Sequence, residues 1–248
     1  MTTHPPVIIR PTEVRDFPGI TALCRAVYPT SQPWAPDQLG SHLQVFPQGQ
    51  LVAVTGAEEQ VVGMAASLII MWDDYEELHA WRDFTDRGYF RNHDPAGRTL
   101  YGAEVMVHPA MQRRRIGKRL YEARRDIART HRLARIRAGA RLRGYHKYAG
   151  RLTPHEYVLG ILNGRIKGPT LSFQLREGFE VFDVVGNYIT NDPESLGYAA
   201  LIEWLNRAVA TPADVALRDP KWRVGPVRPR ATPARRPQDR RIRSDRPS

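Results

Sequence analysis

The sequence has few of the residues that a disulfide framework, a metal cluster or a membrane span would need. Cys24 is its only cysteine, which excludes an internal disulfide and a cysteine-ligated metal site. Cys24 falls within an apolar series of helical spacing, which predicts a buried position and not a nucleophile. The eight histidines show no metal-ligand spacing, so we expect no metal. The longest apolar run, residues 61–72, is about half the length of a membrane-spanning helix.

The N-terminal residues MTTHPPVIIR lack a charged segment followed by a long apolar one. This pattern is not that of a signal peptide, and we expect a cytoplasmic protein without a membrane partner.

The net charge of +11 is concentrated at the C-terminal end. Residues 207–248 carry 12 Lys and Arg against 4 Asp and Glu, a net charge of +8, which leaves +3 for residues 1–206. The same segment contains 7 of the 20 prolines, and we predict that residues 211–248 are largely disordered. Two interpretations of this tail stay open: a solvated extension, which we favour, and an arm that binds nucleic acid or another polyanion.

Residues 100–119, LYGAEVMVHPAMQRRRIGKR, combine a strand, a basic loop and a helix. The apolar run 100–107, interrupted by Glu104, predicts a buried strand. From Ile116 onward the apolar residues keep helical spacing, so the first backbone N–H groups of that helix open onto the loop. These unpaired donors, the helix dipole and the neighbouring basic side chains favour a phosphate group there.

The loop sequence Gln112-Arg113-Arg114-Arg115-Ile116-Gly117 fits the pattern Gln/Arg-x-x-Gly-x-Gly/Ala at every place but one, because Arg115 stands at the first glycine. The segments WDDYEELHAW, LYGAEVMVHP, IGKRLYEARR, RLRGYHKY, TLSFQLREGFEVF and SLGYAALIEW also follow one another in a recognisable order. With these motifs, residues 7–206 resemble the GNAT superfamily of acyl-CoA-dependent N-acyltransferases, in particular the subgroup often fused to a nitrilase-like carbon-nitrogen hydrolase.

The resemblance implies acetyl-CoA as acyl donor, with its pyrophosphate on the loop. The cofactor-binding positions it implies are Val105, Met106, Val107, Gln112, Arg113, Arg114, Arg115, Ile116, Gly117, Lys118, Ser172 and Phe173. A glycine at position 115 would let the backbone approach the pyrophosphate, so Arg115 must direct its side chain away or lay it along the phosphates.

Strand and helix patterns alternate without a repeat, which predicts an α/β domain over residues 1–206 with an insert at 71–98. We expect strands at 7–10, 51–55, 61–70, 100–107, 136–140, 179–185 and 198–205, and helices at 16–28, 36–46, 116–131, 153–162 and 171–177. The resemblance implies a mixed sheet, splayed at the strand that carries Val105 and Val107, with the pantetheine arm in the gap.

Glu104 is the candidate general base, because a carboxylate in an apolar strand beside the cofactor has a raised pKa. An ion pair between Glu104 and an arginine is an equal alternative. The resemblance also implies a tyrosine that protonates the leaving thiolate, but this chain has Gln174 at that position. Tyr145 and Tyr198 are candidate replacements, and simple packing is the alternative for both.

The insert is the candidate wall for the substrate. Trp72, Asp73 and Asp74, followed by Glu76 and Glu77, would suit a cationic amine, although a solvated helix face has the same composition. The opposite wall is expected in residues 141–150.

These patterns predict an N-acetyltransferase that moves an acetyl group from acetyl-CoA to a small amine or a protein amine. Two alternatives stay open. One is a non-catalytic acyl-CoA sensor, and the other is a nucleic-acid-associated acetyltransferase that uses the basic tail. A homodimer is also open.

Overall fold

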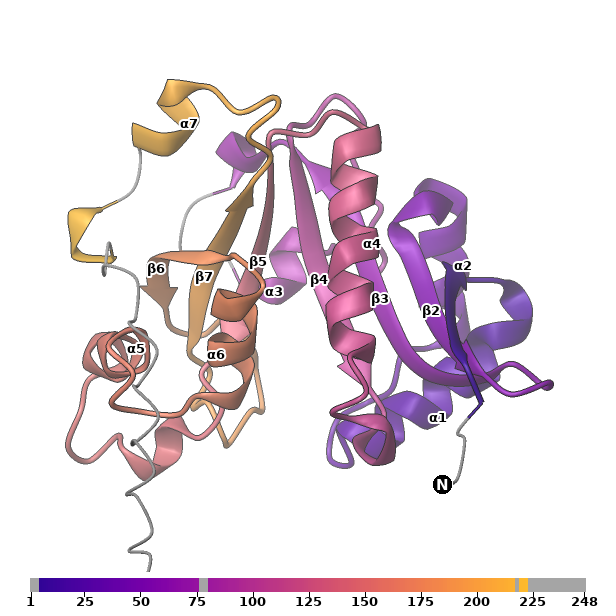
Figure 1. Cartoon of the computed structure of the whole chain (residues 1–248), viewed down its shortest axis with the longest axis horizontal. Coiled ribbons are helices and arrows are strands. Elements are labelled where there is room, and N and C mark those ends of the chain that lie inside the picture. The colour runs from indigo at the N-terminus through magenta and orange to yellow at the C-terminus, as the bar shows by residue number, and fades with distance from the viewer. Residues whose placement is uncertain (1–4, 76–79, 217–218, 223–248) are drawn as a thin grey trace, which may run out of the picture.

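The computed structural model describes residues 5–75, 80–216 and 219–222. In this part of the chain a mixed seven-stranded sheet has the order β1-β2-β3-β4-β5-β7-β6 (Figure 1). The strands are β1 Val7–Pro11, β2 Gln50–Thr55, β3 Gln60–Ile70, β4 Thr99–Val107, β5 Arg135–Arg141, β6 Glu180–Val185 and β7 Ala199–Leu205. The helices are α1 Phe17–Val27, α2 Pro36–Val45, α3 Trp81–Phe84, α4 Ile116–Thr130, α5 Pro154–Leu162, α6 Pro169–Arg176 and α7 Pro212–Ala216. The predicted α/β class and each predicted strand and helix are confirmed to within a few residues.

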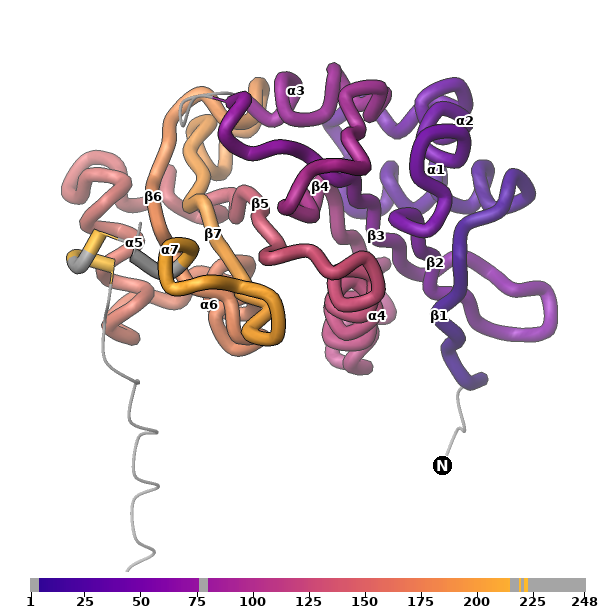
Figure 2. Tube along the Cα trace, turned by 90° about the horizontal axis from the view of Figure 1, so that it is seen from above, coloured from indigo at the N-terminus to yellow at the C-terminus, as the bar shows by residue number. Residues whose placement is uncertain are grey.

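Helices cover both faces of the sheet. Figure 2 shows α1, α2 and α3 on one face and α4, α5 and α6 on the other. The alternation of side chains along β3 matches this arrangement, because Met64, Ala66 and Leu68 pack with Ile20 of α1. Between them, Ala65 packs with Ile116 of α4, and Ser67 accepts a hydrogen bond from Arg124 of α4.

The sheet is splayed between β4 and β5, as expected. These parallel strands pair only at Thr99↔Arg135, Leu100↔Ile136 and Tyr101↔Arg137, and then diverge (Figure 1). A β-bulge follows immediately on the other side of β4, since Gly102 pairs with Ser67 and Glu104 pairs with Ala66. Ala103 is therefore the extra residue, and the strand bends where the sheet opens.

Tyr188 lies at the fork of the two strands. Its hydroxyl is hydrogen-bonded to the hydroxyl of Tyr101 on β4, and both side chains are buried. Its ring lies against Gly139 of β5, where an added Cβ would be 2.1 Å from a ring carbon. Only glycine at position 139 leaves room for this ring. The Tyr188 side chain packs with the cluster on the α1 face and fills the fork between the strands.

The start of α5 follows its predicted signal. Thr153 accepts a hydrogen bond from the backbone of Glu156 at 3.2 Å, and the Glu156 carboxylate accepts one from the backbone of Thr153 at 2.7 Å. Pro154 occupies the first helical position. No helix in the described ranges has the length and apolar character needed to cross a bilayer.

The first residues of the C-terminal segment contact the domain. Residues 212–216 form α7, and Asp214 accepts hydrogen bonds from Thr211 and Arg135. Trp222 is 5% exposed and stacks on His155 at a centroid distance of 5.7 Å. The Trp222 ring and the Asp214–Arg135 ion pair hold residues 211–216 and 219–222 against the domain, while the prediction that residues 211–248 are largely disordered stays a prediction. Residues 223–248 lie outside the described residues.

Candidate active site

The loop before α4 contains two arginines in left-handed backbone conformations. Arg115 is the N-cap of α4 and adopts a left-handed conformation, with φ 61° and ψ 11°. Arg113 also has a positive φ, 64°. Both side chains are exposed, while Ile116 is buried against the sheet. Arg115 thus takes the backbone conformation that a glycine would adopt freely, at a cost of about 1–2 kcal/mol.

Gly117 lies where α4 meets α6. A Cβ at this position would be 3.3 Å from the ring of Phe173 and 3.9 Å from the side chain of Val107. This close contact places Phe173 and the neighbouring Ser172, both half-buried, beside the first turn of α4. The predicted cofactor residues of β4, the loop and α6 are therefore grouped around the opening of the sheet. Their roles in binding stay predictions.

His108 ends β4 and does not face a reacting group. Its Nδ1 accepts a hydrogen bond from the backbone of Ala110 at 3.2 Å, which caps the short turn after the strand.

Glu104 lies at the bulge, half-buried, with its carboxylate on the α1 face. Tyr28, which follows α1, donates a hydrogen bond to Glu104 Oε1 at 3.2 Å, and the backbone N–H of Val105 donates to the same oxygen at 3.0 Å. Burial raises the pKa of Glu104 above its ordinary value, and these hydrogen bonds act in the opposite direction. Among the described residues no arginine forms an ion pair with this carboxylate, so the structural alternative for Glu104 is not found.

Arg124 of α4 supports the bulge from the opposite face. Its guanidinium donates to the carbonyl oxygens of Ala66 and Glu104, at 3.0 and 2.5 Å, and to Ser67 Oγ at 3.0 Å. The side chain is 1% exposed, and a Cβ on Gly102 would be 2.8 Å from it. Arg124 therefore binds backbone oxygens on both strands at the bend that aims Glu104.

Trp81 of the insert forms a hydrogen bond with Ala103, the extra residue of the bulge. Its Nε1 donates to the carbonyl of Ala103 at 2.9 Å. The indole therefore pairs the main-chain oxygen of the residue that the bulge displaces from the ladder.

On the other side of the opening, Arg141 ends β5. It donates to both carboxylate oxygens of Asp192, at 2.7 and 2.6 Å, and to Glu194 at 3.0 Å. The same guanidinium lies 5.8 Å from the ring centroid of Tyr28. A series of contacts thus runs from Glu104 through Tyr28 and Arg141 to Asp192, although no local pattern in the sequence connects these four residues.

The two tyrosines predicted to replace the thiolate acid differ in their surroundings. Tyr145 is buried and its hydroxyl donates to the carbonyl of Leu152 at 3.0 Å, which is a packing arrangement. Tyr198 is half-buried with its ring 5.6 Å from that of Tyr145, and its hydroxyl has no partner within the described ranges. Both roles stay predictions.

Trp72, Asp73 and Asp74 are not brought together with Glu104. They follow β3 at the end where Ile70 pairs with Thr99, five residues along β4 from Glu104, or roughly 17 Å of strand. Trp72 is buried, with the guanidinium of Arg137 4.4 Å from its ring centroid, while Asp73 and Asp74 are exposed. The ring of Trp72 is occupied by a cation of the protein itself, which argues against a substrate there. Glu76 and Glu77 lie outside the described residues.

The splayed α/β sheet with its helices on both faces is the fold of GNAT proteins. Residues 16–150, just over half of the chain, match the sequence model of the acetyltransferase (GNAT) family. The chain belongs to this family, as its motifs predicted.

Two proteins of Bacillus subtilis (strain 168) are similar in sequence. The first, named "Probable hydrolase YhcX", is 44% identical over 200 residues, which make up 81% of this chain and 39% of that protein. This chain therefore spans well under half of that relative, whose name is compatible with the expected hydrolase-linked subgroup. The second, named "Uncharacterized N-acetyltransferase YkwB", is 37% identical over 179 residues, or 72% of this chain and 78% of that protein.

The loading GNATL domain of CurA from Lyngbya majuscula has a similar structure. It is 18% identical, has a TM-score of 0.71, and the match covers 82% of this chain and 99% of that one. At this identity the similarity concerns the fold.

Proposed function

We propose that the protein transfers an acetyl group from acetyl-CoA to a neutral amine, with Glu104 as the group that receives the proton of the amine. The position of Glu104 carries this proposal. Its carboxylate lies at the bulge next to the splay, on the face opposite α4, with a pKa raised by burial. A thioester entering from the α4 side and an amine entering from the α1 side would meet at this point.

The chemistry requires little beyond this arrangement. The amine nitrogen attacks the thioester carbon, Glu104 takes the proton directly or through one water, and the carbon-sulfur bond then breaks. The N–H of Val105, which here donates to Glu104, is a donor for the developing oxyanion once the carboxylate turns toward the amine. Tyr28 holds the carboxylate at the site, because burial keeps the pKa of the Tyr28 hydroxyl well above its ordinary value and it stays a donor.

The charges around Glu104 favour an amine acceptor. Asp192 and Glu194 bind Arg141, and Glu194 also binds Arg143, so this side of the opening offers three carboxylates, including Glu104, against two guanidiniums. An amine that arrives as its ammonium ion is attracted to this surface, loses its first proton to solvent, and then reacts as the neutral amine while Glu104 is free to accept the second.

Release of the CoA thiol from acetyl-CoA, measured with a panel of small amines and N-terminal peptides, tests the proposal. We expect at least one amine to accelerate release, and Glu104→Gln to reduce turnover by about a hundredfold with little change in acetyl-CoA affinity. If acetyl-CoA binds tightly and no amine accelerates thiol release, the protein is instead the non-catalytic sensor. The tail residues that would carry nucleic-acid binding lie outside the described residues, and that alternative stays a prediction.

A further inference from the structure

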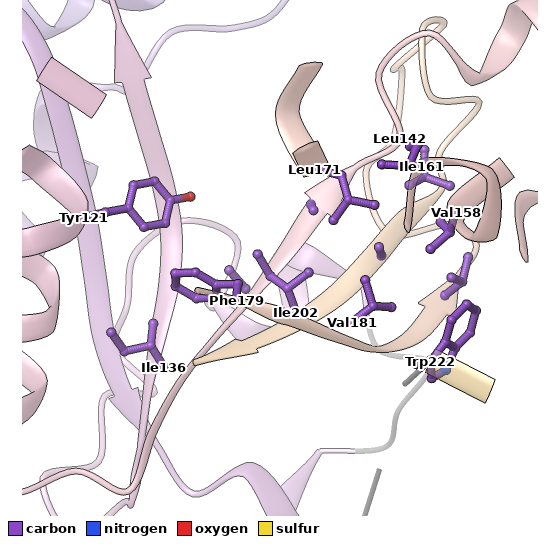
Figure 3. Packing of buried hydrophobic residues seen from close by; sticks show 14 of the residues in the cluster. Tyr121, Ile136, Leu142, Val158, Ile161, Leu171, Phe179, Val181, Ile202 and Trp222 are labelled. Atoms are coloured by element: carbon purple, nitrogen blue, oxygen red, sulfur yellow. The ribbon is translucent and has the colours of Figure 1, made fainter. Parts of the chain in front are cut away.

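A buried polar pair between α4 and α6 has no role in the chemistry described so far. Gln174 of α6 donates from Nε2 to the hydroxyl of Tyr121 on α4 at 2.9 Å. Tyr121 is 4% exposed and Gln174 6% exposed, within an otherwise apolar cluster. The rings of Phe173 and Phe179 meet Tyr121 edge to face, at centroid distances of 5.5 and 5.4 Å. In Figure 3 the Tyr121 ring lies at the margin of this cluster, with its hydroxyl directed toward the side of Leu171.

Two hydrogen-bonding groups of this pair have no partner in the described part of the chain. Gln174 Oε1 is buried and has no hydrogen-bond partner in the described part of the chain. The Tyr121 hydroxyl accepts from Gln174, so its own proton remains to be donated, and the described residues supply no acceptor for it. Buried polar groups are nearly always paired in proteins. The pair therefore offers one O–H donor and one amide oxygen to a molecule that binds beside it.

The pair lies one helical turn beyond the loop where we expect the CoA pyrophosphate. Tyr121 follows Gly117 by four residues on α4, so it lies on the same helix face and about 6 Å further along the helix axis. Phe173 touches both positions, since its ring borders Gly117 and also packs on Tyr121. A pantetheine arm that starts at the expected phosphate site and runs into the gap between β4 and β5 would therefore pass the Tyr121 hydroxyl.

Arg124 completes the surroundings of Tyr121. Its guanidinium lies 5.6 Å from the centroid of the Tyr121 ring, and it is buried without a carboxylate ion pair among the described residues. Burial raises the pKa of Tyr121, so the hydroxyl is protonated at neutral pH. The positive charge of Arg124 acts in the opposite direction, and Glu104 of β4 and Glu177 after α6 act with burial. A fixed cation beside the ring stabilises the negative charge that would appear on the oxygen if the proton left.

We infer that Tyr121 is the acid that protonates the departing CoA thiolate, and that Gln174 is the residue that positions its hydroxyl. This inference rests on the acyl transfer proposed above. As the tetrahedral intermediate collapses, the carbon-sulfur bond breaks and its electron pair moves to sulfur. The Tyr121 O–H proton then passes to that sulfur, and Tyr121 recovers a proton from solvent after the thiol has left. The proton lost by the amine goes separately to Glu104, so the overall reaction forms one amide and one thiol.

Tyr121→Phe tests the inference because it removes one oxygen and keeps the ring. With an amine that the wild type accepts, we expect turnover to fall by about tenfold to a hundredfold, while CoA affinity measured by calorimetry stays within about twofold. Tyr157→Phe is the matched control, since Tyr157 is a buried tyrosine whose hydroxyl donates to the carbonyl of Arg143 at 3.0 Å. It should leave turnover nearly unchanged.

A double-mutant cycle separates the acid from its positioning residue. Gln174→Leu should lower turnover in the wild-type background and have little further effect in Tyr121→Phe, because its contribution passes through that hydroxyl. Equal effects of Gln174→Leu in both backgrounds would overturn the assigned role of Gln174.

A fluorinated tyrosine at position 121 tests the acid without changing its shape, and it serves if Tyr121→Phe does not fold. Fluorination lowers the pKa of the hydroxyl, so the alkaline limb of the turnover profile should move to lower pH. An unmoved limb, or full turnover in Tyr121→Phe, would overturn the inference. A weakened CoA affinity with unchanged turnover would also overturn it and would make the pair a binding element. Failure of acyl transfer itself would instead appear as an inactive wild type.

Discussion

The hydroxyl of Tyr28 lies 3.2 Å from Glu104 Oε1 and donates a hydrogen bond to it. This contact joins the end of α1 to the bulge of β4, and it places a hydrogen-bond donor on the carboxylate that we propose as the base. It also means that a residue outside the loop before α4 acts on the pKa of Glu104, lowering it against the larger effect of burial.

Tyr28→Phe should therefore move the acid limb of the pH profile to higher pH. The hydrogen bond from Tyr28 lowers the pKa of Glu104 against the effect of burial, so its loss raises that pKa further. A base works only when deprotonated, so kcat/KM should fall most at low pH and recover toward the wild-type plateau at high pH. The profile of Tyr28→Phe combined with Glu104→Gln serves as the control and should lack this limb. An acid limb that stays in place would contradict the assignment.

Gly117→Val should weaken acetyl-CoA binding more than the loss of any one loop arginine side chain. The added branches would crowd Phe173, which lies 3.3 Å from the position of a Cβ, and would block the approach of a phosphate to the first amides of α4. We expect at least a tenfold loss of affinity by calorimetry. Gly40→Ala on α2, where a Cβ meets nothing within 4 Å, is the control for an added side chain. Unchanged binding in Gly117→Val would mean that the phosphate site lies elsewhere.

Arg115→Gly should stabilise the fold by about 1 kcal/mol, because the φ of 61° is strained for arginine and free for glycine. If the guanidinium binds phosphate, CoA affinity should become less sensitive to salt, since one charged contact is lost while the amides come closer. Arg115→Ala is the matched control, because it removes the charge and keeps the strain. Chemical denaturation and calorimetry at two salt concentrations measure both effects. A less stable Arg115→Gly protein would show that the side chain holds the loop through other contacts.

His42 should make the fold sensitive to acid. It is 1% exposed, its Nε2 lies 2.7 Å from the carbonyl of Gly88, and burial lowers its pKa from 6.5 to about 4. Between these two values the unfolded chain binds a proton that the folded protein does not, so stability falls as the pH decreases from about 6.5 to 4. The free energy of unfolding is therefore lower at pH 4 than at pH 6.5 by about 3 kcal/mol.

Urea unfolding at pH 7 and pH 4.5 measures this contribution. His42→Gln keeps a donor for Gly88 and does not titrate, so its stability should depend less on pH than that of the wild type. His155→Gln changes an exposed histidine and should keep the wild-type dependence. Equal pH dependence in the wild type and His42→Gln would show that His42 is not the group responsible.

The sequence by itself determined the elements, including the strand, loop and helix of residues 99–130. Apolar period and turn residues are local signals, so the strand 99–107, the helix after it and the Thr153 cap could be predicted from neighbours a few residues apart. Glu104 was recognisable for the same reason, as a carboxylate within an apolar run.

Only the tertiary structure decided which residues surround Glu104 and the opening. Tyr28 and Glu104 are 76 positions apart, and Tyr121 and Gln174 are 53 apart, so no periodicity connects them. Trp72, set among acidic residues, has the local pattern of a cation-binding ring, yet the packing of β5 against the insert places Arg137 on that ring. Local patterns encode the period of a helix or strand, whereas a contact between distant residues depends on how the elements pack around one core.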